Sequence, residues 1–537
     1  MKALLLFPNM LWRLFLNPWW LRAAFVLLFW GSFVATTDAQ TKVWDKTFGG
    51  IKSYADPDFP DDNFVYGESI LKVMVATPDG GYLLVGYSES DKGGDKSEDS
   101  KGARDLWLVR IDAAGNKLWD KTLAGGGSEA VVATPDGGFL LGGETFYVLK
   151  LDANGNKVWN RDFGSGQLHA LSVSPNGGYL LGGTSSSGGN SDFRVVKISE
   201  TGDKEWDKTF ESTNPDMLSA LAATDNGGYL LGGWTSGENV SGKGSETGRG
   251  SDDYYVIRID GSGNKIWERQ FGGRSRDQLK DIAATPDGNY LLGGESSSRI
   301  SGDKSEANKG SGGPDYWIVK IDEDGNKLWD KTYGGESADN LKAIIVTPDN
   351  GFLLGGTFSS GVSGDKSEPF HSTSLNFDYW IVKIDDSGSK IWDKTFGGND
   401  NDLLQDVIVS PDGSYLLGGW SSSGIGGDKS EAVKGITDFW VIKIKDKDPA
   451  KQDQTITFDL IPIKTSDDAP FALPARASSG LPVSFSVVGP ATVADSILTI
   501  TGYGIVTVRA SQPGNEMYSP APDVSRTFIV EKLTPLS

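Results

Sequence analysis

Four aspartates hold equivalent positions in a repeated sequence, and their type and spacing are the first sign of chemistry in the chain. Each lies eight residues before a Thr or Ser that opens a turn; they are Asp216, Asp277, Asp339 and Asp402. Carboxylates gathered at one place repel one another unless each accepts backbone hydrogen bonds or the group shares a cation. Two interpretations are therefore open: hydrogen bonding to backbone at the start of a strand, or a weak site for calcium or a cationic ligand.

A second pattern is the sequence Gly-Asp-Lys-Ser-Glu. It occurs at residues 94–98, 302–306, 364–368 and 427–431, and residues 244–246 are a remnant of it. Oxygen-bearing side chains at alternate positions are of the kind that bind calcium. The lysine in the middle opposes a cation, however, and the spacing is not that of an EF-hand loop. The favoured interpretation is a solvated loop whose Asp and Glu hold its own turn.

Catalytic motifs are scarce in this sequence. There are only two histidines. His169 lies in an apolar strand pattern, which favours a packing or solvent-facing role, and His371 lies in a loop with no partner that the sequence identifies. No Ser/His/Asp ordering, His-Glu-x-x-His motif or phosphate-binding loop is present. We therefore predict no catalytic residue and no organic cofactor.

The elements that carry these residues belong to one repeat. Residues 315–335 read DYWIVKIDEDGNKLWDKTYGG, and close copies begin at Asp105, Asp253 and Asp378. Aromatic and β-branched residues on both sides of an Asp-Gly turn predict a β-hairpin. Each hairpin is followed by a modest apolar run and then by a turn that leads into a Leu-Leu-Gly-Gly strand.

The number of repeats predicts the fold class. The Leu-Leu-Gly-Gly strand occurs seven times, starting at Leu83 (as Leu-Leu-Val-Gly), Leu140, Leu180, Leu230, Leu291, Leu353 and Leu416. Seven units of four short strands, joined by Gly-rich turns, predict an all-β, seven-bladed β-propeller.

The tryptophan of the outer strand of each unit is shifted by one strand relative to these units. It appears at Trp44, Trp119, Trp159, Trp206, Trp267, Trp329 and Trp392, so one copy precedes the first unit and none follows the last. We therefore expect residues 42–48 to pair with residues 440–444 and close the ring. We also expect these tryptophans to be buried between neighbouring blades.

The two faces of such a ring differ in their loops. Successive strands run up and down, so the Gly-Asp-Lys-Ser-Glu loops and the Gly-Gly segments that precede the four aspartates share one face. Binding residues concentrate on long loops held by a rigid scaffold, which makes this the expected binding face. The four aspartates begin the innermost strands and are therefore expected near the mouth of the central channel.

The ends of the chain have a different composition. Residues 1–39 contain Lys2, Arg13 and Arg22, then an apolar stretch over residues 23–35 and small residues up to Ala39, which predicts a secretory signal. A membrane anchor is the alternative, but the apolar stretch is shorter than the ~20 residues of a spanning helix. We expect cleavage after Ala39 and no membrane insertion afterwards.

The C-terminal part carries another pattern. The propeller is predicted to span residues 41–447, and residues 448–454 form a charged linker that contains proline. Residues 455–532 then show short alternating segments separated by Gly, Ser and Pro, which predicts an Ig-like β-sandwich.

Composition narrows the class of partner. The net charge of −21 argues against nucleic acid and anionic membranes. The chain has no cysteine, which excludes disulfides and zinc–thiolate sites. We expect a monomer.

The repeat resembles propeller repeats in large secreted proteins of environmental Gram-negative bacteria. The segment over residues 455–532 resembles bacterial Ig-like repeats of the same proteins, which are often exported by type IX secretion. The Asp-x-x-Gly-Asn-Lys-x-Trp core resembles, more weakly, the tryptophan-docking repeat of quinoprotein dehydrogenases. That family's vicinal cysteine pair cannot exist here, so no such activity is carried over.

Taking these features together, we interpret the sequence as that of an extracellular, non-enzymatic binding or adhesion scaffold, whose partner is an extracellular protein or a polysaccharide. The alternative is a secreted glycan-active or redox enzyme, which would require a cleft with convergent carboxylates of perturbed pKa.

Overall fold

The structure is a computed structural model that describes residues 40–55, 63–143, 145–185, 190–237, 251–371, 376–446, 454–515, 518 and 521–532. The chain divides into two units, residues 1–39 and 40–537, and all of the described residues lie in the second. The expected signal segment, most of the expected linker and the remnant at residues 244–246 therefore lie outside the description.

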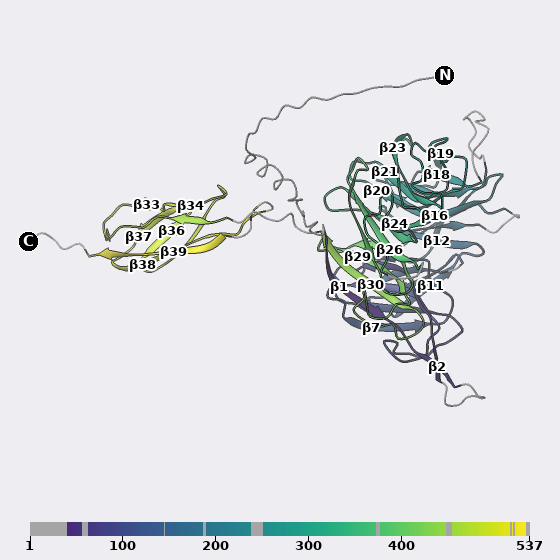
Figure 1. The fold of residues 1–537 in the computed structure, drawn as a ribbon, viewed down its shortest axis with the longest axis horizontal. Helices are drawn as coiled ribbons and strands as arrows, with labels where there is room; N and C mark the ends of the chain where they lie inside the picture. The colour runs from purple at the N-terminus through teal and green to yellow at the C-terminus, as the bar shows by residue number, and fades with distance from the viewer. Residues whose placement is uncertain are drawn as a thin grey trace, which may run out of the picture. The chain divides into compact units, whose positions relative to one another are not determined.

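Every regular element among the described residues is a β-strand (Figure 1). The same residues contain no helix of the length and apolar character that crossing a membrane requires. The expectation of an all-β protein is confirmed.

Seven four-stranded antiparallel sheets lie between Gln40 and Asp446 in the described part of the chain, and we number them in chain order. Sheet 1 is β4 (Ser69–Ala76), β5 (Tyr82–Ser88), β6 (Asp105–Ile111) and β7 (Lys117–Leu123); sheet 2 is β8 (Ala130–Ala133), β9 (Phe139–Gly142), β10 (Tyr147–Leu151) and β11 (Lys157–Asp162); sheet 3 is β12 (Gln167–Val173), β13 (Tyr179–Thr184), β14 (Phe193–Ile198) and β15 (Lys204–Phe210).

The other four sheets complete the set. Sheet 4 is β16 (Asp216–Ala223), β17 (Tyr229–Thr235), β18 (Asp253–Ile259) and β19 (Lys265–Phe271); sheet 5 is β20 (Asp277–Ala284), β21 (Tyr290–Ser296), β22 (Asp315–Ile321) and β23 (Lys327–Tyr333); sheet 6 is β24 (Asp339–Val346), β25 (Phe352–Phe358), β26 (Asp378–Ile384) and β27 (Lys390–Phe396); sheet 7 is β28 (Asp402–Val409), β29 (Tyr415–Ser421), β30 (Asp438–Asp446) and β1 (Gln40–Phe48). A separate hairpin, β2 (Lys52–Ala55) with β3 (Asn63–Tyr66), precedes sheet 1.

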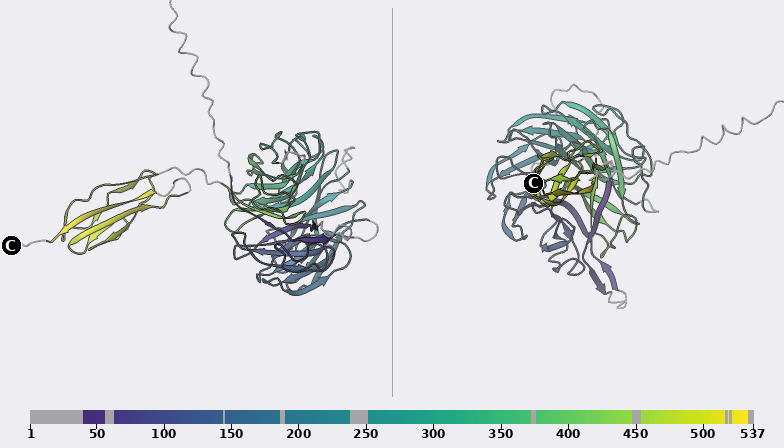
Figure 2. Two further views of the ribbon diagram at one scale, coloured as in Figure 1. Left: turned by 60° about the horizontal axis from the view of Figure 1, so that its bottom comes forward. Right: turned by 90° about the vertical axis from the view of Figure 1, so that its left-hand side faces the viewer.

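The sheets follow one another around a common centre (Figure 2). The first strand of each sheet contacts the first strand of the next, and β28 of sheet 7 contacts β4 of sheet 1, so the series closes on itself. β1 pairs antiparallel with β30, with Lys42 opposite Ile444 and Thr47 opposite Trp440. Figure 1 draws these two strands side by side. The expected pairing of residues 42–48 with residues 440–444 is confirmed, and the architecture is propeller-like.

The local chemistry of the repeat explains its strands and turns. In the hairpin of sheet 5, Asp322 Oδ1 accepts hydrogen bonds from the backbone N–H groups of Asp324 (3.0 Å) and Asn326 (2.8 Å). Gly325 has a φ of 79°, which favours glycine. All seven residues of β22 are buried because neighbouring sheets cover both faces of the third strand.

The outer-strand tryptophans are less buried than expected. Trp267 is only partly buried; its Nε1 donates to the backbone oxygen of Glu323 (3.0 Å) in the next sheet, and its ring lies against Gly325. Packing between sheets is therefore confirmed, but full burial is wrong, because the outermost strand has no further strand beyond it. The fully buried tryptophans lie in the third strands, where, for example, Trp380 packs 5.0 Å from the ring of Tyr316.

The C-terminal residues form their own β-structure around one hydrophobic core that includes Phe458, Leu498, Val508 and Phe528. Its three sheets pair β32–β39–β38–β35, β33–β37–β36 and β31–β34. The strands are β31 (Ile456–Phe458), β32 (Lys464–Thr465), β33 (Phe471–Ala472), β34 (Ala475–Ala477), β35 (Ser484–Val488), β36 (Ala491–Ala494), β37 (Ile497–Ile500), β38 (Gly504–Gln512) and β39 (Ala521–Glu531).

Candidate functional site

The Gly-Asp-Lys-Ser-Glu loops of sheets 1, 5, 6 and 7 fold back onto the outermost strand of their own sheet, and we call each of them a loop clip. In sheet 5, the backbone N–H of Ser305 donates to Asp330 (2.8 Å), and Glu306 accepts a hydrogen bond from the backbone N–H of Thr332 (3.0 Å). Lys304 Nζ donates to the Thr332 hydroxyl (2.9 Å). The clip motif is therefore hydrogen-bonded to the Trp-Asp-Lys-Thr motif of the outer strand.

The lysine of the clip is buried rather than solvated. Lys304 is 2% exposed, its ammonium lies 5.5 Å from the centre of the Trp317 ring, and burial lowers its pKa to about 8. The expectation of a solvated loop is therefore wrong for this residue. The Asp and Glu were expected to hold the loop's own turn, but they bind other segments: Asp303 accepts a hydrogen bond from the backbone N–H of Gly272 (3.3 Å), which follows the outer strand of sheet 4, and Glu306 accepts one from Thr332 on β23.

The four predicted site residues each begin the first strand of their sheet, and all four are buried. Asp277 Oδ2 accepts hydrogen bonds from the backbone N–H of Gly273 (2.7 Å) and the Ser298 hydroxyl (2.8 Å). Asp339 and Asp402 make the same pair of bonds in their own sheets. Burial raises the pKa of Asp339 to about 7 and that of Asp402 to about 6.

These bonds support the hydrogen-bonding interpretation for Asp277, Asp339 and Asp402. Within the described ranges, no group of three or more His, Cys, Asp or Glu side chains is arranged to hold a metal ion. Calcium at the channel mouth stays a prediction that titration must test.

The two histidines have different surroundings. His169 is largely buried in β12, and burial lowers its pKa, as expected for a packing role. His371 Nε2 lies 3.1 Å from the carboxylate of Asp428, in the clip of the next sheet, while its backbone N–H donates to Asp378 (3.1 Å). Hydrogen bonding to Asp378 and the charge of Asp428 raise the pKa of His371. The imidazole therefore links sheets 6 and 7.

The contact between His371 and Asp428 could have been predicted by aligning the clip sequences. His371 holds the position of Lys309 and Lys434, which pair with the clip aspartates of their next sheets, Asp365 (3.4 Å) and Asp95 (2.5 Å). A cation at this position thus ties successive clips together.

Two half-buried carboxylates on the innermost strands were not predicted. Asp281 accepts a hydrogen bond from the backbone N–H of Ile344 in the next sheet (2.8 Å), and Asp406 accepts one from Met74 in sheet 1 (2.7 Å). Burial raises the pKa of Asp281 to about 7 and that of Asp406 to about 6. Their hydrogen bonds make them links between sheets.

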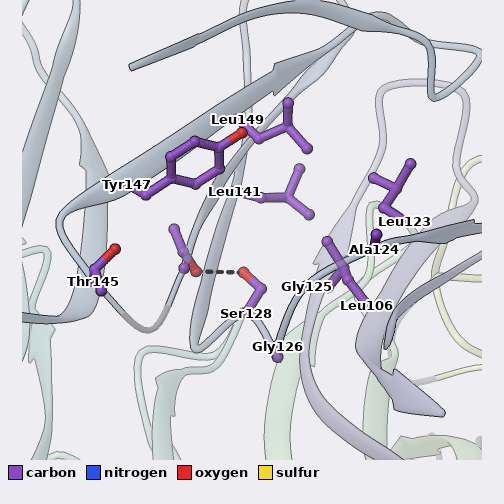
Figure 3. A pocket seen from close by; sticks show the side chains of 13 residues that line it. Leu106, Leu123, Ala124, Gly125, Gly126, Ser128, Leu141, Thr145, Tyr147 and Leu149 are labelled. Carbon is purple, nitrogen blue, oxygen red and sulfur yellow. Dashed lines mark hydrogen bonds between the residues drawn. The ribbon is translucent and has the colours of Figure 1, made fainter. Parts of the chain in front are cut away.

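Sheet 2 carries no clip, and a pocket lies between it and sheet 1 on the clip face. The pocket has a volume of about 280 Å³ and is bounded by the connection through residues 124–128 (Figure 3). Its side-chain walls are Leu106, Leu123, Leu141, Leu149 and Tyr147. The described chain of sheet 2 runs from the end of β9 at Gly142 to the start of β10 at Tyr147, which leaves no room for a clip.

Two smaller side chains explain why this interface is open. Tyr316 of sheet 5 packs on Trp380 of sheet 6, but the equivalent pair between sheets 1 and 2 is Leu106 and Tyr147. Leu123 likewise stands where sheet 5 has Tyr333. Leucine in place of tyrosine leaves space that a packed interior would otherwise fill.

The lining of the pocket is mainly apolar. Its walls are mainly leucine, and the Ser128 hydroxyl at its floor donates to the backbone oxygen of Gly142 (2.6 Å) (Figure 3). A nucleophilic serine requires a base to take its proton, and here the proton is given to a carbonyl. The pocket is suited to burying an aliphatic or aromatic group.

Comparison with known proteins gives only a likeness of fold. No protein-family model matches the sequence, and no curated protein matches it. Similar solved structures include a protein of unknown function from Bacteroides caccae (12% identity, 61% of this chain and 93% of that chain, TM-score 0.34) and the Pan2 WD40 domain of Neurospora crassa (11%, 74% and 95%, TM-score 0.42). BamB from Moraxella catarrhalis is another (14%, 76% and 98%, TM-score 0.36). We draw no functional argument from these values.

Proposed function

We propose that the chain is an extracellular, non-enzymatic binding or adhesion scaffold. In this proposal the seven sheets are the blades of one propeller, residues 455–532 are an Ig-like module, and the ligand binds on the clip face. The observation that carries the proposal is the apolar pocket between sheets 1 and 2, at the interface where the repeat lacks both its clip and its aromatic pair.

The lining of the pocket favours a protein partner over a polysaccharide. Leu106, Leu123, Leu141 and Leu149 offer dispersion contacts and few hydrogen bonds, whereas a sugar ring presents hydroxyl groups that need polar partners. Burying one Leu- or Phe-sized side chain contributes about 1.5–3 kcal/mol. Such an anchor is the usual centre of a protein interface, surrounded by weaker contacts.

The sequence supports the extracellular setting. The pattern of residues 1–39 is that of a secretory signal, and the net charge of −21 disfavours nucleic acid as a partner. Limited proteolysis tests the proposed division into modules: cleavage between residues 447 and 453 should release two stable pieces, and a single resistant core would contradict it.

The enzyme alternative finds its strongest support in Asp281 and Asp406, whose raised pKa values are typical of catalytic carboxylates. Each carboxylate, however, accepts two backbone N–H groups: Asp281 from Ile282 and Ile344, and Asp406 from Val407 and Met74. That pattern favours a structural role.

The experiment is a binding screen against extracellular proteins and glycans with three versions of the chain. The wild type is compared with Leu106→Tyr/Leu123→Phe, which installs aromatic residues of the kind found at the equivalent positions of other sheets and fills the pocket. Leu118→Phe is the matched control, because Leu118 lies on β7 and is 56% exposed. A partner bound by the wild type and the control but lost in the filled variant supports the proposal.

Another outcome of the screen would contradict the proposal that the ligand binds in the pocket. Partners that bind the filled variant as well as the wild type would place the binding surface elsewhere. Loss of glycan binding alone in the filled variant would identify the polysaccharide as the ligand of the pocket.

A further inference from the structure

Every sheet buries a cation on its third strand, near the face opposite the clips. In five sheets this cation forms an ion pair with the aspartate that follows the proline in the turn between the first two strands of the same sheet. The pairs are Arg110–Asp79 (2.5 Å), Lys150–Asp136 (2.8 Å), Lys320–Asp287 (3.1 Å), Lys383–Asp349 (3.0 Å) and Lys443–Asp412 (2.9 Å). The repeat therefore neutralises its buried cation with a carboxylate, as the cost of burying a charge requires.

Sheets 3 and 4 depart from this rule because asparagine replaces the aspartate. In sheet 3 the turn residue is Asn176, and Lys197 instead pairs with Glu205 (3.2 Å). In sheet 4 the turn residue is Asn226, and its cation, Arg258, forms no ion pair with the residues that the structure describes. Among the described cations of this series, Arg258 alone has only neutral hydrogen-bond partners.

Arg258 is buried and incompletely paired. It is 4% exposed, and its guanidinium donates from Nη1 to the Tyr290 hydroxyl (2.6 Å) and from Nη2 to Asn226 Oδ1 (2.9 Å). Within the described part of the chain, its Nε has no hydrogen-bond partner. A guanidinium has five N–H donors in a planar fork, so donors remain for another acceptor.

A small cavity lies beside this guanidinium. It has a volume of about 80 Å³, is lined by Arg258, Asn226, Tyr290, Gly288 and Asn289, and lies between sheets 4 and 5. Asp225 and Glu323 also line it, but both are exposed and neither forms an ion pair with Arg258. The cavity holds a group of a few non-hydrogen atoms, well below the size of a sugar or a nucleotide.

We propose that this cavity binds the carboxylate group of a ligand, with Arg258 as the recognising cation. The equivalent group of the other sheets is itself a carboxylate: in sheet 1, Nη2 of Arg110 donates to both oxygens of Asp79 (2.5 and 2.6 Å). An arginine beside a carboxylate forms the strong, charge-assisted contact that Asn226 cannot supply. The ligand is either a small carboxylate or the carboxylate end of a larger molecule. The site lies on the turn face and is separate from the pocket between sheets 1 and 2.

The test uses acetate as the probe and the melting temperature of the full chain as the readout, at constant ionic strength with chloride as the reference anion. Ligand binding to the folded state raises the melting temperature progressively once the probe exceeds its dissociation constant. We expect acetate to raise it and chloride and acetamide to leave it unchanged. No acetate response beyond that of chloride, or an equal response to acetamide, would overturn the proposal.

Two asparagine variants make the test specific. Asn226→Asp supplies the carboxylate within the chain, so it should raise the melting temperature without acetate and abolish the acetate response. Asn176→Asp is the matched control in sheet 3, where Glu205 already pairs with the lysine, and it should keep the full acetate response. An Asn226→Asp chain that still responds to acetate as the wild type does would refute the assignment to Arg258.

The source of the carboxylate is then resolved with two further probes, N-acetylglutamate and glucuronate. Tighter binding of the first would identify an acidic peptide group, and tighter binding of the second a uronic acid. Binding equal to that of acetate would show that the site recognises the carboxylate alone.

Discussion

The clip of sheet 7 binds β1, so side chains as well as strand pairing close the ring. Asp45 of β1 accepts hydrogen bonds from the backbone N–H of Ser430 (2.8 Å), Nε1 of Trp440 (3.3 Å) and Nζ of Lys42 (2.9 Å). Ser430 lies 385 positions away in the sequence, which makes this contact a direct probe of closure. We therefore examine Asp45→Ala.

The expected loss follows from the donors that the variant leaves behind. Asp45 is 5% exposed, and its removal orphans the Ser430 N–H and the Trp440 indole, each at about 1–3 kcal/mol. We expect Asp45→Ala to lower the free energy of unfolding by about 3–5 kcal/mol at pH 7. The matched control is Asp207→Ala in sheet 3, where no clip sequence follows. Asp207 forms a partly buried ion pair with Arg194 (2.9 Å) within its own sheet, so its loss should cost about 1–2 kcal/mol.

The difference in unfolding free energy between the wild type and Asp45→Ala should depend on pH in a defined direction. Burial raises the pKa of Asp45, but hydrogen bonds from Ser430 and Lys42 outweigh burial and hold it below 3.8. A lowered pKa in the folded state contributes stability that is present above pH 3.8 and is lost as the pH falls through the folded value. The gap between wild type and Asp45→Ala should therefore persist at neutral pH and shrink in acid.

Urea unfolding and hydrogen exchange at the amides of β30 are the assays. Faster exchange in β30 for Asp45→Ala, with little change for Asp207→Ala, supports closure through the clip. Equal losses of stability in the two variants, or unchanged exchange at the seam, would refute the reasoning.

Three further predictions concern residues elsewhere in the ring. His371→Lys should flatten part of the pH dependence of the melting temperature, because a raised histidine pKa gives stability that is present below pH 6.5 and is lost as the pH rises through the folded value. Trp317→Ala should cost about 3–5 kcal/mol and Trp267→Ala clearly less, since only the first is fully buried; equal losses by urea unfolding would contradict this. Calorimetric titration with calcium, run beside Asp277→Asn/Asp339→Asn, decides the cation hypothesis: no heat, or identical heats, leaves only hydrogen bonding.

Much of the fold could be predicted because each repeat contains the turn residues that mark where its strands begin and end. The Asp-Gly hairpin around Gly325 and the spare outer strand at Trp44 were enough to predict the strands and the pairing that closes the ring. Burial of the outer tryptophans was overestimated, because composition alone does not say that the outermost strand, unlike the third strand, has no neighbour beyond it.

The site was harder to predict because it depends on contacts between units. From its sequence, the loop that contains Lys304 is expected to be solvated. The structure shows that the loop packs on the outer strand, where Lys304 is bonded to Thr332 and buried. The contact between His371 and Asp428 joins two sheets, so it could not be predicted from the sequence of either repeat alone. The repeats alone show Leu106 where other units have an aromatic residue, but the pocket that this leaves beside Tyr147 is evident only once neighbouring sheets are in position.

Calorimetric titration with indole tests whether the interface between sheets 1 and 2 is a preformed binding pocket for an apolar group. We predict saturable binding to the wild type and to Leu118→Phe, and no binding to Leu106→Tyr/Leu123→Phe, whose aromatic rings occupy the volume of about 280 Å³. No saturable binding to the wild type, or equal binding to the filled variant, would contradict the claim.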